Sequence, residues 1–129
     1  MGDLSQNFSR YEFACPCGCG ADDVSPELVS ALQGIRALAG VPIIVHSAVR
    51  CEKYNKSVGG KPDSQHLTGK AADISARGIK IFDLLLLTQD IDVFYNGGIG
   101  IYDQHIHVDV RGHMARWTLQ SKQIKTTQY

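Results

Sequence analysis

The stretch HIHVDV, residues 105–110, alternates polar and apolar side chains at every position. Successive side chains of a β-strand point to opposite faces of a sheet, so this alternation predicts a half-buried strand. The core-facing side chains would be Ile106, Val108 and Val110. The side chains on the other face, each able to bind a metal ion or transfer a proton, would be His105, His107 and Asp109. A half-exposed strand with a polar outer face fits the same alternation, so the stretch alone leaves both interpretations open.

A second segment, HLTGKAAD at residues 66–73, carries two further groups that commonly bind zinc. His66 ends a polar loop, Gly69 permits a tight bend, and Asp73 lies on the next predicted strand. By itself the segment also fits a surface histidine and a solvated carboxylate. Together with one histidine of the 105–110 stretch, it completes the three protein ligands of a catalytic zinc site, which keeps a fourth position open. The helical H-E-x-x-H motif is absent, so a zinc peptidase here needs another scaffold.

Around these two segments the chain alternates helical and extended patterns. Ser25 suits a helix N-cap and Pro26 the first helical position, and apolar residues recur at helical spacing up to Gly40. Further expected elements are a short helical piece (9–13), strands (41–45, 71–75, 97–102 and 105–110), helices (52–58 and 79–88) and a polar loop (61–68). A turn at Asp103-Gln104 would join the last two strands into a hairpin. This order predicts an α+β domain with a small, mostly antiparallel sheet and flanking helices.

Length and composition predict one compact domain over residues 1–129, with an irregular N-terminal arm (1–24) and a loose tail (118–129). Hydrophobic residues make up 43% of the chain and charged residues 20%, as in ordinary globular proteins. The 13 basic and 13 acidic residues cancel, which disfavours a nucleic-acid partner. The longest apolar run, 84–87, is far too short to span a membrane, and the N-terminus shows no secretory signal. We expect a monomer without nucleic-acid or membrane partners.

Four cysteines lie outside these segments, and three of them belong to the run CPCGCG. They are Cys15, Cys17, Cys19 and Cys51. Reduced thiols near the surface, or one or two disulfides in an oxidising compartment, are the simplest interpretations. A structural zinc site with four thiolates is the alternative. Because C-x-C-x-C is cramped beside the usual C-x2-C pairs, the sequence leaves all of these open.

Several motifs, in order, resemble those of the M15 family of zinc peptidases. They are Ser64-x-His66-x-x-Gly69-x-Ala71-x-Asp73, the downstream His107-Val108-Asp109, Ser47-Ala48-Val49-Arg50 in place of the family's S-G-Y-R, the Asn55…Val58-Gly59-Gly60 segment and Phe13-x-Cys15. The resemblance extends to about Trp117 and is nearest to short, single-domain members from phages and prophages. The family holds D-alanyl-D-alanine carboxypeptidases and dipeptidases, and phage endolysins that cut L-alanyl-D-glutamate bonds. It implies a DD-peptidase/hedgehog-like zinc peptidase fold and a peptidoglycan stem peptide as partner.

The resemblance also implies roles for individual residues. The ligands of a Zn²⁺ cofactor would be His66, Asp73 and His107. Arg50 matches the family arginine that reaches the substrate and steadies the developing oxyanion, a role that suits a permanently charged guanidinium. Ser64 would contact the substrate or order its loop. Asp109 would orient the imidazole of a ligand histidine.

The sequence departs from the family at the general base. The best-known members carry an acidic residue three positions before the last ligand histidine, where this chain has Gln104, which cannot act as a base. By strand geometry, His105 shares the face of His107, and its ordinary pKa of about 6.5 suits proton transfer near neutrality. We expect His105 to act as the base, ahead of Asp103 and then Asp109.

The expected function is zinc-dependent hydrolysis of peptide bonds that involve D-amino acids in peptidoglycan, by a carboxypeptidase or an endolysin-type endopeptidase. Gln104 motivates an alternative, a non-catalytic zinc-containing module that binds the cell wall or belongs to a phage particle. A signalling domain on the same scaffold is a third option, because fold alone does not fix function. We expect synthesis in the bacterial cytoplasm and action at the cell wall after phage-type lysis. The remaining histidines, His46 and His113, are expected to be satisfied or surface residues.

Overall fold

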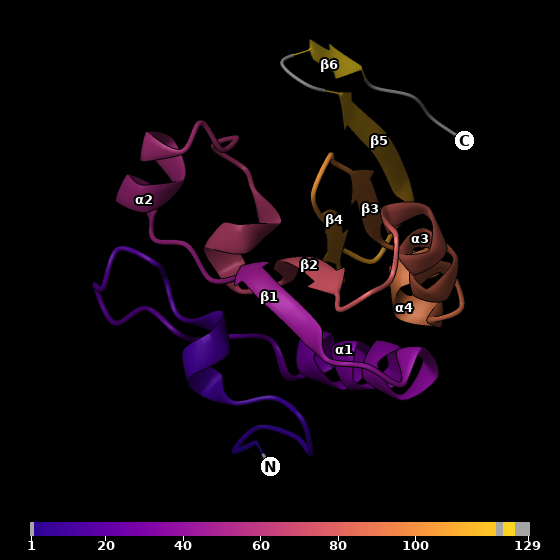
Figure 1. Cartoon of the computed structure of the whole chain (residues 1–129). Coiled ribbons are helices and arrows are strands. Elements are labelled where there is room, and N and C mark those ends of the chain that lie inside the picture. The colour runs from indigo at the N-terminus through magenta and orange to yellow at the C-terminus, as the bar shows by residue number, and fades with distance from the viewer. Residues whose placement is uncertain (1, 121–122, 126–129) are drawn as a thin grey trace.

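A computed structural model of the chain describes residues 2–120 and 123–125. In chain order its elements are η1 (Arg10–Phe13), α1 (Pro26–Ala39), β1 (Ile43–Ser47), α2 (Glu52–Ser57), η2 (Gln65–Thr68), β2 (Ala71–Ala76), α3 (Ile81–Gln89), α4 (Asp92–Tyr95), β3 (Gly98–Ile101), β4 (Ile106–Asp109), β5 (Ala115–Gln120) and β6 (Gln123–Lys125). In the view of Figure 1, α2 and the N-terminal arm lie on the opposite side of β1 from α3 and α4. No helix in the described part of the chain is both long and apolar enough to cross a membrane.

The strands form one six-stranded sheet in the order β1-β2-β4-β3-β5-β6. Neighbouring strands pair antiparallel, except that β3 and β5 run parallel. The expected α+β fold with a small, mostly antiparallel sheet and flanking helices is therefore confirmed. The strands β2 and β4 lie side by side in the middle of the sheet, and their register sets Asp73 directly opposite His107.

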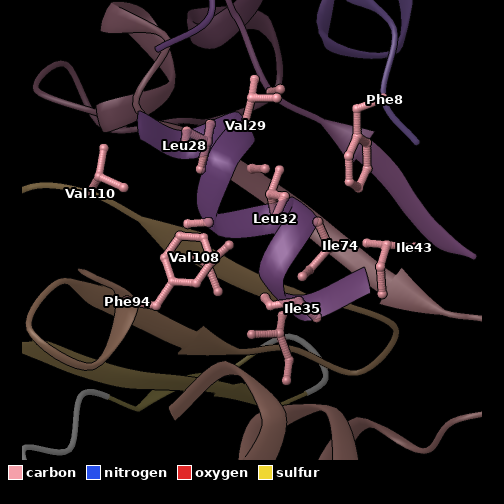
Figure 2. Packing of buried hydrophobic residues seen from close by; sticks show 14 of the residues in the cluster. Phe8, Leu28, Val29, Leu32, Ile35, Ile43, Ile74, Phe94, Val108 and Val110 are labelled. Atoms are coloured by element: carbon pink, nitrogen blue, oxygen red, sulfur yellow. The ribbon is translucent and has the colours of Figure 1, made fainter. Parts of the chain in front are cut away.

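Helix α1 begins and ends where the sequence predicts. The Ser25 hydroxyl accepts a hydrogen bond from the backbone N–H of Leu28, and Gly40 ends the helix in the left-handed conformation at φ 69°. The apolar face of α1 packs into the core, and Figure 2 shows Leu28, Leu32 and Ile35 gathered with Ile74 and Val108 of the sheet. Full burial of a leucine or isoleucine side chain contributes about 1.5–3 kcal/mol, so this face holds the helix on the sheet.

The β4 strand buries the side chains that the alternation assigned to the core. Ile106, Val108 and Val110 are at most 6% exposed and belong to the hydrophobic cluster. The strand is not at the edge of the sheet, because β2 and β3 pair with its two sides. Its polar face is consequently held on a backbone with hydrogen bonds on both sides.

The predicted loose tail over 118–129 is wrong in part. Residues 118–120 continue strand β5, and 123–125 form β6, which pairs antiparallel with β5. Strand β3 pairs with β4 on one side, and the backbone groups on its other side need partners. Strand β5 supplies them in a parallel pairing that starts with Gly98 opposite Ala115. The rest of the predicted tail, 121–122 and 126–129, lies outside the described residues. Helix α4 and the single turn η2 were also missed by the sequence pattern.

The N-terminal arm has η1 as its regular element within residues 2–24. Two aromatic side chains fix it to the core: Phe8 is 1% exposed and Phe13 is fully buried, and their rings lie 5.9 Å apart. The backbone N–H of Val49 also donates to the carbonyl oxygen of Phe13 at 3.0 Å. The arm is thus attached to the segment that follows β1.

Candidate metal centre

Three candidate ligands come together from two neighbouring strands and one short turn. Asp73 of β2 and His107 of β4 face each other across the β2–β4 pair. His66 lies on η2, which begins where the Ser64 hydroxyl accepts from the His66 backbone N–H and ends at Gly69 in the left-handed conformation. An added Cβ at Gly69 would overlap the backbone of Asp23, so this turn needs glycine both for its φ of 70° and for space.

The side-chain donors of these three residues converge. The Nε2 atom of His66 and the Nδ1 atom of His107 each lie 3.3 Å from Oδ1 of Asp73. One donor atom from each residue can be chosen so that all lie within 4.8 Å of one another. All three residues are buried. Buried donors of this kind, two imidazoles and a carboxylate, are the set that zinc binds.

In each imidazole, the ring nitrogen that does not face Asp73 is hydrogen-bonded to another group. Nδ1–H of His66 donates to the carbonyl oxygen of Ala48, and Nε2–H of His107 donates to Oδ2 of Asp109, each at 2.7 Å. In neutral rings the other nitrogen then carries a lone pair, and both lone pairs face Oδ1 of Asp73. Three lone-pair donors that face one point repel one another unless a cation lies between them, so the residues fit a bound metal ion.

The electrostatics of the cluster also favour positive charge at this point. Burial raises the pKa of Asp73, but its contacts with the imidazoles of His107 and His66 lower it more, so the net pKa lies well below its ordinary value of 3.8. Burial lowers the pKa of His107, whereas its contacts with Asp109 and Asp73 raise it more, so the net direction is upward. The two carboxylates therefore favour a positive charge beside His107.

Asp109 is held rigidly behind His107. Its carboxylate accepts from the backbone N–H of Gly98 at 2.8 Å and from the guanidinium of Arg111, whose Nη2 lies 2.7 Å from Oδ2. An added Cβ at Gly98 would overlap this carboxylate, so the glycine makes room for it. Burial raises the pKa of Asp109, yet hydrogen bonds from His107 and Arg111 bring it well below the ordinary range. The structure thus places Asp109 where an orienting carboxylate is needed.

Arg50 reaches the cluster from the segment after β1. Its Nη2 lies 3.2 Å from Oδ2 of Asp73, its Nη1 donates to Oδ1 of Asn55 and its Nε donates to the Ser47 hydroxyl. The backbone N–H of Arg50 donates to the carbonyl oxygen of His66. A surface hollow of about 490 Å³ adjoins this segment and is lined in part by Arg50. The guanidinium is therefore fixed beside the candidate ligands and next to an open surface.

His105 lies at the rim of the same face. Its Nε2 is 3.8 Å from Oδ2 of Asp73, and its side chain is 27% exposed. Burial lowers the pKa of His105 below its ordinary 6.5, and the Asp73 charge opposes that shift. Asp103 and Gln104 are exposed in the preceding turn. The structure therefore brings His105 to the cluster, with a solvent-accessible ring.

Two aromatic residues that the sequence analysis did not single out complete the wall of the site. The Tyr102 ring stacks on His105 at 4.5 Å between centroids, and Trp117 packs on His107 at 4.9 Å. Nε1–H of Trp117 donates to the Tyr102 hydroxyl at 3.1 Å, and an added Cβ at Gly100 would overlap the indole. Trp117 lies beyond the predicted hairpin, so only the parallel pairing of β5 with β3 brings it here.

The two remaining histidines lie apart from the three candidate ligands. His46 is exposed, and its Nε2 lies 2.7 Å from the Ser75 hydroxyl. Its ring centroid is 6.3 Å from that of His105. His113 is exposed in the turn that precedes β5. These positions agree with the expectation of satisfied or surface histidines.

Comparison with known proteins assigns most of the chain to one family. A family model described as Peptidase M15 matches residues 6–109, about four fifths of the chain. No curated protein matches the chain. The matched range contains Arg50 and all three candidate ligands, and it ends at Asp109. The chain therefore belongs to the peptidase M15 family of metal-dependent peptidases.

Proposed function

We propose that this chain is a zinc peptidase that hydrolyses peptide bonds involving D-amino acids in the stem peptides of bacterial peptidoglycan. The observation that carries the proposal is the convergence of His66, Asp73 and His107 on one point beside Arg50. Membership of the family supports the peptidase chemistry. The sequence resemblance to D-alanyl-D-alanine carboxypeptidases and phage endolysins supports the choice of substrate.

The three convergent residues would hold the zinc ion. When bound, zinc acts as a Lewis acid that polarises a carbonyl oxygen and makes a water molecule more acidic. Asp109 and the Ala48 carbonyl oxygen fix the two imidazole rings, so that Nδ1 of His107 and Nε2 of His66 face the ligand point. Fixed donors lose little freedom on binding, which favours a tight and well-defined site.

Arg50 is suited to bind the substrate oxygen that becomes negative. A guanidinium carries five N–H groups, and three contacts to Ser47, Asn55 and Asp73 engage its three nitrogens. A second N–H on each terminal nitrogen can still donate to a carbonyl or carboxylate oxygen. The same contacts hold the side chain in place, so that little reorganisation is needed during the reaction.

His105 is our proposed general base. Its ring lies on the ligand face, stacks on Tyr102 and is partly open to solvent, so it can take a proton from water and return it to the leaving amine. Asp103 is the second candidate, because it is exposed one residue before Gln104. Asp109 is the weakest of the three, since its carboxylate is fully buried and engaged by His107 and Arg111.

We further propose that the protein acts at the cell wall, which it reaches after phage- or prophage-type lysis. The alternative is a non-catalytic module that keeps the zinc site but only binds the wall. Gln104 favours this alternative, because it replaces the acid that the best-known family members use. The accessible position of His105 favours the enzyme.

Digestion of purified peptidoglycan tests the proposed function. The zinc-loaded protein, the same protein in chelator and the His107→Ala variant would be incubated with walls of several chemotypes, and released fragments identified by mass spectrometry. We expect fragments from the zinc-loaded protein alone. Loss of terminal alanine would identify a carboxypeptidase, and freed stem peptides an endopeptidase. If the zinc-loaded protein releases no fragments but sediments with the walls, the enzyme proposal is contradicted and the binding module is supported.

A further inference from the structure

The four cysteines form a second cluster, where the N-terminal loop approaches the start of α2 (Figure 1). Sγ of Cys15 lies 3.4 Å from that of Cys17 and 3.8 Å from that of Cys51, and the last two are 3.6 Å apart. With Cys19 included, all four sulfur atoms lie within 4.8 Å of one another. All four residues are free cysteines.

These separations match the coordination shell of one tetrahedral metal ion. Four sulfurs bonded to zinc at about 2.3 Å lie about 3.8 Å apart at the corners of a tetrahedron. Thiolate sulfur also selects zinc over the hard cations that prefer oxygen. A set of four protein ligands leaves no position for water or substrate, so such a site is structural.

Two glycines explain how the cramped C-x-C-x-C run can bring three sulfurs together. Gly18 and Gly20 have φ values of +82° and +90°, the left-handed region that side chains disfavour. The backbone N–H of Gly18 donates to the Cys15 carbonyl oxygen, and the Cys15 N–H donates to the carbonyl oxygen of Ala21 at 2.8 Å. The run is thereby folded into a compact loop, with the Cys51 thiol beside it.

Backbone N–H groups are directed at two of the sulfurs. The N–H of Cys51 donates to Sγ of Cys15 at 3.5 Å, and the N–H of Tyr54 donates to Sγ of Cys51 at 3.4 Å. Such donors offset part of the negative charge that four thiolates bring to one point.

We propose that Cys15, Cys17, Cys19 and Cys51 hold a structural zinc ion that ties the N-terminal arm to the segment carrying Arg50. Cys51 follows Arg50 directly, and the Val49 N–H is bonded to the Phe13 carbonyl oxygen on the arm. The metal would add a cross-link next to that hydrogen bond. This site is independent of the peptidase function, because its ligands are distinct from those of the first centre.

Metal counting tests the proposal. The full chain would be isolated under reducing conditions with zinc, freed of loosely bound ions by gel filtration, and its zinc measured by elemental mass spectrometry. We expect two ions per chain in the unsubstituted protein. The Cys17→Ser/Cys51→Ser variant should keep one ion, and the reciprocal His66→Ala/Asp73→Ala variant should also keep one. A chain without zinc at the first centre would still bind zinc at the cysteine site. Failure of one proposal can therefore be distinguished from failure of the other.

Cobalt replacement gives a readout that needs no substitution. Co²⁺ bound to thiolates absorbs through sulfur-to-metal charge transfer, which ligation by two histidines and an aspartate cannot produce. We expect this absorption in the unsubstituted chain and its persistence in the His66→Ala/Asp73→Ala variant. Absence of the absorption, together with a zinc content that the cysteine substitutions leave unchanged, would overturn the proposal. Disulfides among these cysteines that survive isolation under the same reducing conditions, detected as a lowered intact mass of the chain, would also overturn it.

Discussion

The direction of two imidazole rings decides whether the first centre can bind a metal. Rotation of His107 would turn its Nδ1 away from Asp73, and the 2.7 Å hydrogen bond to Asp109 opposes that rotation. Asp109 is itself fixed by Arg111 and by the Gly98 N–H. Metal affinity should therefore depend on a residue that need not touch the metal.

The Asp109→Asn change should weaken zinc binding about 10- to 100-fold, because an amide holds the imidazole less firmly and lowers its basicity. Zinc affinity by competition with a chromophoric chelator measures the effect. Asp83→Asn, which alters an exposed aspartate on α3, is the matched control and should bind like the unsubstituted chain. Unchanged affinity in Asp109→Asn would contradict the orienting role.

The His105→Gln change should reduce turnover by about 10²- to 10⁴-fold, the usual contribution of a positioned proton-transfer group. Zinc content should stay at the unsubstituted level, because His105 is not among the three convergent ligands. Steady-state kinetics on a peptidoglycan fragment, with metal analysis of the same sample, checks both. Undiminished turnover would contradict His105 as the general base and leave Asp103 as the next candidate. The Asp103→Asn variant then tests that residue.

The Arg50→Lys change keeps the positive charge but loses the forked donor geometry. Loss of one oxyanion donor typically costs about 10²- to 10³-fold in kcat, and we expect a loss in this range with zinc still bound. Steady-state kinetics measures the loss in kcat, and metal analysis of the same sample measures the zinc content. A kcat within a few-fold of the unsubstituted value would show that Arg50 only supports Asp73.

At the residue scale, strand alternation alone predicts which side chains of 105–110 share a face, and the structure agrees. It could not reveal Arg111, Tyr102 or Trp117 as neighbours of the site. Arg111 lies two residues beyond Asp109, just past the end of β4, and alternation within the strand does not show that its guanidinium turns back onto the Asp109 carboxylate. Trp117 depends on a strand pairing that is distant in sequence.

At the scale of elements, the site depends on how β3, β4 and β5 pack beside one another. Gly100 lies opposite His107 on one neighbour and opposite Trp117 on the other. The absent side chain at Gly100 leaves space for the indole, which in turn packs on His107 and bonds Tyr102. A side chain at this position would disturb the wall of the metal centre.

Gly100→Ala should therefore lower the free energy of unfolding by about 1–3 kcal/mol, the usual cost of overpacking a filled region. Gly34→Ala is the matched control, because its added methyl meets only the end of the Ile91 side chain and α1 gains helix propensity. Urea unfolding of both variants gives the comparison. Equal stability of Gly100→Ala and the unsubstituted chain would mean that the indole is not tightly packed there.

The elements that the sequence predicted are those whose patterns are local. Helix α1 has its cap, its first-turn proline, its apolar period and its terminal glycine within one segment. Strands β5 and β6 lack such patterns, because they form by pairing with other strands, and α4 is too short, at four residues, to show a helical period. Prediction of the two strands would have required knowledge of which sheet edge was open.

At the scale of the whole molecule, residues 48–51 connect the two candidate metal centres. The Ala48 carbonyl oxygen holds His66, Arg50 pairs with Asp73, and Cys51 belongs to the thiol cluster. Both centres also join segments that are far apart in the chain. Metal binding should therefore stabilise the fold as well as permit chemistry.

Chelation should lower the melting temperature by about 8 °C or more. A ligand at about 1,000 times its Kd adds about 4 kcal/mol, and each kcal/mol shifts Tm by about 2–8 °C in domains of roughly this size. Calorimetry with and without chelator measures it. The His66→Ala/Asp73→Ala variant should show a smaller shift, from the cysteine cluster alone. A Tm that chelator leaves unchanged in the unsubstituted chain would contradict both centres.

The most direct test of the first centre is an anomalous-difference map recorded at the zinc edge from crystals of the zinc-loaded chain. We expect a peak bonded to Nε2 of His66, the Asp73 carboxylate and Nδ1 of His107, with Nε2 of His107 still hydrogen-bonded to Asp109. A map without density at that point, or a zinc ion held there by other atoms, would contradict the metal centre on which the proposed peptidase depends.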